Sequence, residues 1–169
     1  IAMQVIQQAF SHSSSTFMIG KVQGNIVDIL YAPLSPGEVC VAIIFAAVTR
    51  SLMIAVISII TFNFIVDLSI YHFFYLAYFT FVSAFILGAI GIIAGLWAEK
   101  FDHMATVTNF IIVPLSFLSG TFYSIERLPG ILHTISQYNP FFYMIDGFRF
   151  TFINTSDGSI TIGLIYLAA

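Results

Sequence analysis

The sequence predicts an all-α protein, a polytopic bundle of helices that span a membrane. Of the 169 residues, 59% are hydrophobic and only 8% are charged, with a mean hydropathy of +1.00. A soluble domain carries about 25% charged residues to keep its surface hydrated, so most of this surface must face lipid. The apolar residues also fall into long runs, without the alternation that is typical of a membrane β-barrel.

Three apolar runs are each long enough to cross a bilayer. A helix rises 1.5 Å per residue, so about 20 residues cross the roughly 30 Å of hydrocarbon. The predicted spans cover residues 38–66, 73–98 and 104–123. Shorter runs at either end are expected to be the end of an earlier span and, over 160–169, the start of a later one. We therefore expect residues 1–169 to form a single transmembrane domain that is a fragment of a longer protein.

The connector before the first complete span reads "KVQGNIVDILYAPLSPGEV". Apolar residues at helical spacing follow Gly24, and Pro33 stops the helix that they predict. Ser35 can cap the next helix, with Pro36 at its first position. The pattern predicts a short amphipathic helix over about 24–34, rigidly joined to the span. Such a helix is either an interfacial anchor or a handle on which a soluble partner pushes.

Small residues form a stripe on the second predicted span. They recur at helical spacing and include a GxxxG step; the residues are Ala84, Gly88, Gly91 and Gly95. Lipid provides no hydrophobic drive between helices, so close backbone approach must supply the attraction. The stripe therefore predicts a helix-packing surface, either inside the same bundle or between two subunits.

Arg50 is the only Lys or Arg within the three predicted spans, and it lies far from either end of its span. It lies about 18 Å along the helix from Glu38 at 1.5 Å per residue. A lone arginine near the middle of a membrane costs about 2.5–3.5 kcal/mol on insertion scales. Two interpretations follow: Arg50 extends to the headgroups, or it faces an internal path and meets an anionic group of the cargo.

The segment 126–150 is apolar but too short and too broken to cross the membrane as one helix. Two half-length helices separated by a proline are typical of a re-entrant hairpin, whose irregular backbone must be covered by protein or water. Its candidate functional residues are Pro129, Tyr138, Asn139, Pro140, Asp146, Gly147 and Arg149. Asp146 and Arg149 can pair on one helix face, either as a solvated pair of little energetic value or as part of a gate.

Several kinds of site are missing from the sequence. The stretch "STFMIGKV" lacks the first glycine and the final hydroxyl residue of a phosphate-binding loop, so we expect no ATP site in this chain. The four histidines have no metal-ligand spacing, and no catalytic triad or carboxylate pair is suggested. A net charge of −3 gives no basic surface for nucleic acid. We therefore expect neither an enzyme nor a cofactor-binding protein.

Two stretches, "GNIVDILYAPLSPGE" and "PLSFLSGTFYSIERLPGILHTISQYNPFFYMIDGFR", together resemble the type 2 ATP-binding-cassette (ABC-2) exporter permeases of bacteria. The resemblance covers nearly the whole chain after about residue 20. It implies that the connector is a cytoplasmic coupling helix that docks on the ATPase subunit. The residues that carry this role by resemblance are Gly24, Asn25, Asp28, Leu30, Pro33 and Leu34. The re-entrant hairpin would then face outward.

The same resemblance implies a multi-pass protein of the bacterial inner membrane with six spans in each subunit. A second permease subunit, in a homodimer, and a cytoplasmic ATPase that holds ATP and Mg²⁺ would be its partners, together with membrane lipids. The cargo would be an amphiphile such as a lipid-linked glycan, a lipid or a drug.

Two other functions remain open on the sequence alone: a secondary transporter or channel, and a membrane anchor that carries no cargo. Ion-coupled transporters usually place carboxylates inside their spans, and the long apolar runs here have none. Purification of the full-length protein with or without an ATPase would distinguish these functions.

Overall fold

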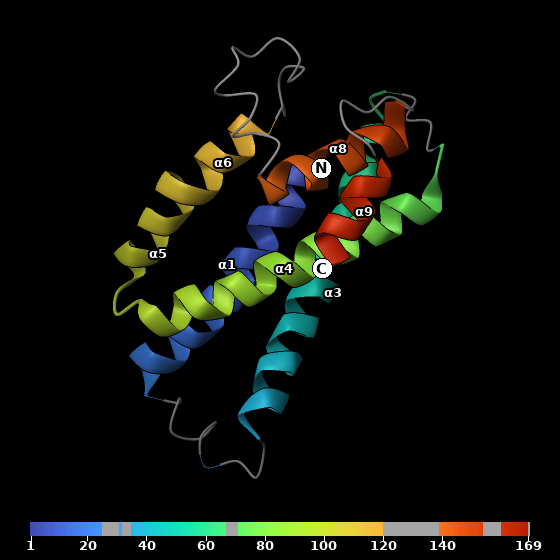
Figure 1. Ribbon diagram of the computed structural model, residues 1–169. Helices are drawn as coiled ribbons and strands as arrows, with labels where there is room; N and C mark the ends of the chain where they lie inside the picture. The colour runs from blue at the N-terminus through green and yellow to red at the C-terminus, as the bar shows by residue number, and fades with distance from the viewer. Residues whose placement is uncertain (25–30, 32–34, 67–70, 120–138, 154–159, 169) are drawn as a thin grey trace.

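The computed structural model describes residues 1–24, 31, 35–66, 71–119, 139–153 and 160–168 (Figure 1). In this part of the chain every regular element is helical, so the predicted all-α helix bundle is confirmed. The elements are α1 (Ala2–Gln23), α3 (Pro36–Asn63), α4 (Phe73–Trp97), α5 (Phe101–Val107), the π-helix η1 (Thr108–Ile112), α6 (Val113–Leu118), α8 (Pro140–Ile153) and α9 (Ile160–Ala168).

Within the described ranges, three stretches of helix are long and apolar enough to cross a membrane. They are α3, α4 and the continuous helix Phe101–Leu118, which joins α5, η1 and α6. The first stops short of the predicted end at residue 66, because residues 64–66 form a turn and a bend. The last begins three residues before the predicted start at 104, with Asp102 in its first turn, where a carboxylate interacts favourably with the helix dipole.

The start of α3 is fixed by a capping box. The Ser35 hydroxyl accepts a hydrogen bond from the Glu38 amide at 3.3 Å, and the Glu38 carboxylate accepts one from the Ser35 amide at 2.7 Å. Pro36 occupies the first turn, where its missing N–H costs nothing. The predicted cap at Ser35 is therefore confirmed, and α3 begins at a well-defined point.

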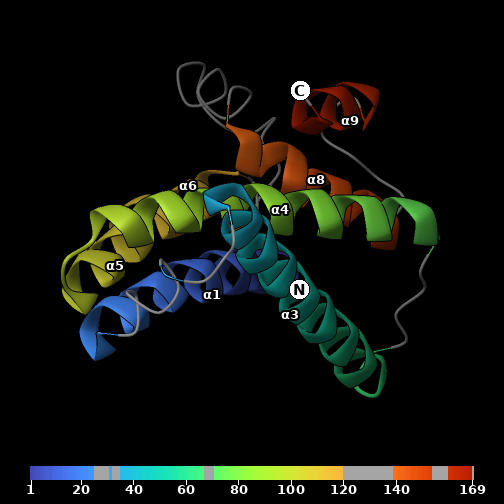
Figure 2. The same ribbon diagram turned by 90° about the horizontal axis from the view of Figure 1, so that it is seen from below.

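Three helices, α1, α3 and α4, form the centre of the bundle. Figure 2 shows α4 between α8 on one side and α1 and α3 on the other. Side chains that are almost fully buried come from α1, α4 and α8, among them Val5, Ile6, Phe10, Met18, Phe79, Leu87 and Met144. Helix α9 packs against α8. The exposed surface of α3 is largely apolar, as lipid-facing surface should be.

The third span changes its hydrogen bonding just before Pro114. The Val113 amide bonds to the carbonyl of Thr108, five residues back, at the end of the π-helix. Proline has no N–H to complete the α-helical ladder, and a π segment is one of the usual ways in which a helix accommodates such a break. A π segment thus accommodates the break at Pro114, and Asn109 within it lines a cavity beside α1.

Candidate functional site

A close backbone contact joins α1 to the small-residue stripe of α4. A Cβ added to Gly91 would lie 2.7 Å from the Phe10 carbonyl oxygen, and one added to Gly95 would lie 2.8 Å from that of Ser14. Gly88 faces the side chain of Ser13, and Ala84 is fully buried on the same helix. The stripe therefore lies against α1 of the same chain. Only residues without a Cβ permit this approach at Gly91 and Gly95.

Polar side chains are concentrated on α1, in the run "SHSSST" from Ser11 to Thr16. Three of these hydroxyls bond to carbonyls one turn earlier: Ser14 and Ser15 donate to Ser11, and Thr16 donates to His12. Such bonds satisfy a hydroxyl inside a helix without any partner from another helix. The helix can therefore present a polar surface within an apolar bundle.

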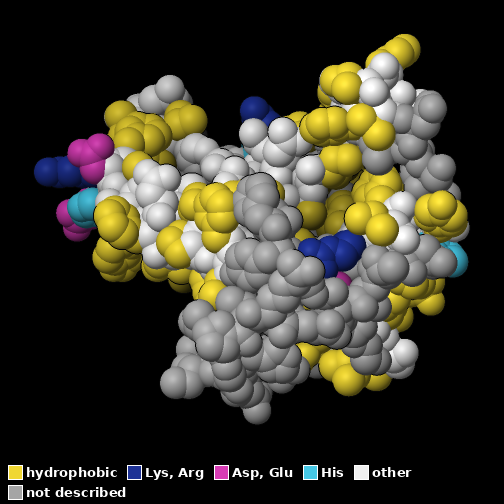
Figure 3. Space-filling view, turned by 90° about the horizontal axis from the view of Figure 1, so that it is seen from above, with side chains coloured by type: hydrophobic (Ala, Val, Ile, Leu, Met, Phe, Trp, Pro, Cys, Tyr) yellow, Lys and Arg dark blue, Asp and Glu magenta, His cyan; other side chains and the backbone are white. Residues whose placement is uncertain are grey.

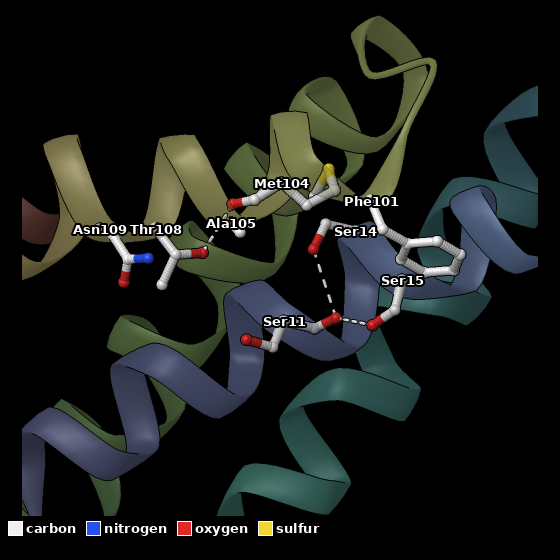
Figure 4. A pocket seen from close by; sticks show the side chains of 8 residues that line it. All are labelled: Ser11, Ser14, Ser15, Phe101, Met104, Ala105, Thr108 and Asn109. Atoms are coloured by element: carbon white, nitrogen blue, oxygen red, sulfur yellow. Dashed lines mark hydrogen bonds between the residues drawn. The ribbon is translucent and has the colours of Figure 1, made fainter.

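A cavity of about 330 Å³ lies between this polar surface and the third span. Figure 4 shows the serine side chains of α1 facing α5 and η1 across it. Its lining combines hydroxyl and amide groups with apolar side chains: Ser11, Ser14, Ser15, Phe101, Met104, Ala105, Thr108 and Asn109. The cavity can hold a group that both accepts hydrogen bonds and contacts apolar surface.

A second cavity of about 180 Å³ lies on the other side of the same polar surface. It is lined by Gln8, Ser11, His12, Ser15, Thr16, Ile19 and Arg50, so Ser11 and Ser15 line both cavities. The Arg50 side chain is exposed, and it forms no hydrogen bond or salt bridge with any residue that the structure describes. Arg50 and His12 line the same cavity, although they come from different helices.

His12 adds a second unsatisfied polar group to this cavity. Its Nδ1 atom is buried and has no hydrogen-bond partner among the described residues. Buried polar atoms are almost always paired, so an unpaired one calls for an explanation. Arg50 and His12 together make the cavity a site for an anion or another hydrogen-bond acceptor.

The polar run on α1 was missed as a site by the sequence analysis, which considered Arg50 alone. His12 and Arg50 are 38 positions apart, and their proximity follows from the packing of α1 on α3. The available signal was the six-residue polar run itself, because so many polar side chains in succession stand out in a chain of this hydrophobic composition.

The predicted coupling residues lie almost entirely outside the described residues. These are Asn25, Asp28, Leu30, Pro33 and Leu34. Gly24 is described: it ends α1 in the left-handed conformation, with a φ of 75°, and its amide bonds to the Lys21 carbonyl. A glycine adopts this conformation without strain, so α1 ends sharply where the connector begins.

The second half of the predicted hairpin is described, whereas Pro129 and Tyr138 lie outside the described residues. Asn139 is 4% exposed. Its side-chain amide donates to the Leu115 carbonyl at 3.0 Å and to the Ser119 hydroxyl at 3.1 Å, and its side-chain oxygen accepts from the Phe141 amide at 3.0 Å. Asn139 therefore caps the start of α8 and joins it to the end of the third span.

Helix α8 begins at Pro140 and extends to Ile153, three residues beyond the predicted end. Gly147 packs on the ring of Phe79 in α4, because a Cβ there would lie 2.4 Å from a ring carbon. Asp146 is only 5% exposed, which corrects the interpretation of Asp146 and Arg149 as a fully solvated pair. The aspartate lies on the buried face of α8 because that helix packs closely against α4.

One group of charged side chains lies at one end of the bundle, apart from the Lys and Arg side chains nearer the middle of the view in Figure 3. Figure 3 shows them at the left of the view, over the turn between α4 and α5, where Glu99, Lys100 and Asp102 are exposed. Apolar side chains cover much of the remaining described surface in that view. This distribution fits a bundle whose charged turn lies in water at one membrane face.

The chain matches a family of known proteins. Residues 1–153 match the family described as ABC-2 type transporter. Curated relatives include the inner membrane transport permease YadH of Escherichia coli and the protein of the same name in Shigella flexneri. Each is 31% identical over 157 residues, which amount to 93% of this chain and 61% of the relative. The chain thus spans less than two thirds of the length of these relatives, and no solved structure matches it.

Proposed function

Because the chain belongs to the ABC-2 type transporter family, we propose that it is part of the permease subunit of a bacterial ATP-driven exporter. The matched relatives are named as inner membrane transport permeases, and three candidate spans fit a multi-pass protein of that membrane. The transport role rests above all on one observation: a polar surface on α1, with a cavity on each side, inside an otherwise apolar bundle.

In this proposal, energy comes from another protein. A cytoplasmic ATPase subunit binds ATP and Mg²⁺ and docks on the connector that follows Gly24. A second permease subunit, forming a homodimer, completes the path. The capping box at Ser35 and Glu38 supports the mechanical role, because it fixes the point at which α3 begins. Closure of the ATPase subunits would then tilt the spans.

The cavity chemistry favours an amphiphilic cargo with an anionic or strongly hydrogen-bonding head. Arg50 supplies a positive charge without a described partner, His12 supplies an unsatisfied nitrogen, and the serines supply hydroxyls. An apolar groove of about 240 Å³ between α3 and α4, lined by residues such as Leu52, Ile59 and Leu76, offers a surface for a lipid tail. A lipid-linked glycan, a lipid or an amphiphilic drug each fits this description.

The proposal is tested by capturing the partner. A tagged full-length permease, expressed with its candidate ATPase partner, should retain that ATPase through detergent purification. Asp28→Lys and Leu34→Glu should each weaken the capture, because they change the charge or the apolar face of the docking helix. The matched control is Asp67→Lys, the same charge change in the connector at the other end of α3.

Two results would contradict the proposal. The first is a stable permease that retains no ATPase; the second is equal loss of capture in Asp67→Lys and Asp28→Lys, since the connector would then have no special role. Ion-dependent transport without any ATPase would instead support a secondary transporter.

A further inference from the structure

A single lysine joins the ends of α1 and α4. The Lys21 ammonium donates hydrogen bonds to the carbonyl oxygens of Gly95 at 3.0 Å, Leu96 at 2.6 Å and Ala98 at 2.9 Å. An ammonium group has three donors, so these carbonyls use all of them. The two helix ends lie at the same end of the bundle (Figure 1).

The contact satisfies groups that α4 cannot satisfy alone. The last carbonyls of a helix have no amide donor within the helix. The Ala98 amide bonds to the Ala94 carbonyl, which leaves the carbonyls of Gly95 and Leu96 to find other partners. Lys21 provides that partner, and its charge lies where the α4 dipole is most negative.

The relative direction of the two helices makes the Lys21 charge more stabilising. Gly91 lies beside Phe10 and Gly95 beside Ser14, so α1 and α4 run in the same direction. Their negative dipole ends therefore lie together, and a cation between them stabilises both. Lys21 is the one basic residue in the last turn of α1, and α4 has none in its last turn.

The position of Lys21 also places it between the connector and the cavity. It stands three residues before Gly24, where α1 ends and the connector begins. Its carbonyl partner Ala98 stands three residues before Phe101, the first residue of α5 and part of the cavity lining. Lys21 therefore links the end of α1, just before the connector, to the short turn that leads into the cavity wall.

We propose that Lys21 is a positioning residue for transport, which makes α1 and α4 move as one unit and passes the motion of the connector to α5. This inference rests on the proposed function, because it requires an ATPase that moves the connector. The backbone contacts at Gly91 and Gly95 hold α1 and α4 together within the bundle. Lys21 joins the same two helices at their C-terminal ends, next to the connector.

The experiment measures motion at the cavity wall instead of cargo. In the full-length permease with its ATPase, Ala105→Cys is placed on a background in which Cys40 is replaced by Ser. The rate of labelling by a maleimide is measured with and without MgATP and vanadate. In the parent, nucleotide should change this rate. In Lys21→Met the ATPase should still co-purify and hydrolyse ATP, but nucleotide should no longer change the labelling rate.

Two further variants separate positioning from simple helix stabilisation. Lys21→Arg keeps a cation with several donors and should restore the nucleotide effect, whereas Lys100→Met, in the exposed turn beside α5, should leave it intact. Should Lys21→Met not accumulate, Lys21→Gln is used, since it keeps amide donors and removes the charge; a nucleotide effect of parental size in Lys21→Gln overturns the inference.

The outcomes distinguish the inference from the proposed function. If Lys21→Met retains the full nucleotide effect, Lys21 is only a helix cap and the inference is wrong. A parent protein that captures no ATPase, or whose labelling ignores nucleotide, contradicts the proposed function and the inference together.

Discussion

Gly95 of α4 lies against the backbone of Ser14 in α1, so closely that a Cβ at Gly95 would come within 2.8 Å of the Ser14 carbonyl oxygen. The same holds one turn earlier, between Gly91 and Phe10. These two contacts set the distance between α1 and α4.

Replacing Gly91 by Val should separate α1 from α4. The new side chain would meet the Phe10 carbonyl oxygen at 2.7 Å, and a backbone atom cannot move aside as a flexible side chain can. Overpacking of this kind costs about 1–3 kcal/mol, which a thermal or denaturant unfolding curve in detergent would detect. Gly37→Ala is the control, because a Cβ there meets nothing within 4 Å. Equal stability of the two variants would contradict the packing.

Replacing Gly147 by Ala should displace the ring of Phe79, which is 1% exposed and lies 2.4 Å from the new Cβ. The displacement should lower stability, and Phe79→Leu should recover part of the loss by making room. The double variant should therefore be more stable than the sum of the two single effects predicts. Additive effects in the unfolding measurements would show that α8 and α4 do not meet at these residues.

Asn139→Asp should weaken the link between α8 and the third span. A carboxylate can still accept from the Phe141 amide, but it cannot donate to Leu115 and Ser119 as the side-chain amide does. Loss of a helix cap alone typically costs about 1 kcal/mol. Asn139→Ala loses both functions and should be less stable than Asn139→Asp. The reverse order of melting temperatures would mean that the acceptor at the start of α8 contributes nothing, and a parental melting temperature in Asn139→Asp would mean that the amide donors contribute nothing.

Replacing Arg50 by Gln should abolish transport and leave the amount of protein in the membrane unchanged, if Arg50 faces the path beside His12. Glutamine keeps hydrogen-bonding groups but loses the charge that would attract an anionic head. Transport into inside-out vesicles, measured beside membrane abundance, checks this. Thr49→Ala is the neighbouring control, since its hydroxyl bonds only to the Phe45 carbonyl one turn back. Unchanged transport in Arg50→Gln would favour an arginine that extends to the headgroups.

The features that the sequence predicts well are those encoded locally. Apolar length predicts the spans, and Ser35 with Pro36 and Glu38 predicts where α3 begins. Pro114 indicates a disturbance of the third span, although a π segment is only one of several ways to accommodate it. The glycine spacing on α4 predicts a close contact but does not identify the partner helix.

The features that the sequence does not predict depend on contacts between distant segments. His12 approaches Arg50 only because α1 packs on α3, and Lys21 reaches carbonyls 74 to 77 positions away because α1 and α4 run in the same direction. The buried state of Asp146 likewise follows from the packing of α8. Composition alone suggests that Asp146 lies in water, and packing decides otherwise.

The central claim is that another protein's ATP-driven closure acts on the connector after Gly24. The most direct measurement places a photo-crosslinking amino acid at position 28 of the full-length permease in cells and identifies what it captures. The account predicts a crosslink to a nucleotide-hydrolysing subunit, and labelling of a cysteine at the same position only by reagents that enter the cytoplasm. Labelling from outside the cell, or crosslinks that never include such a subunit, would contradict it.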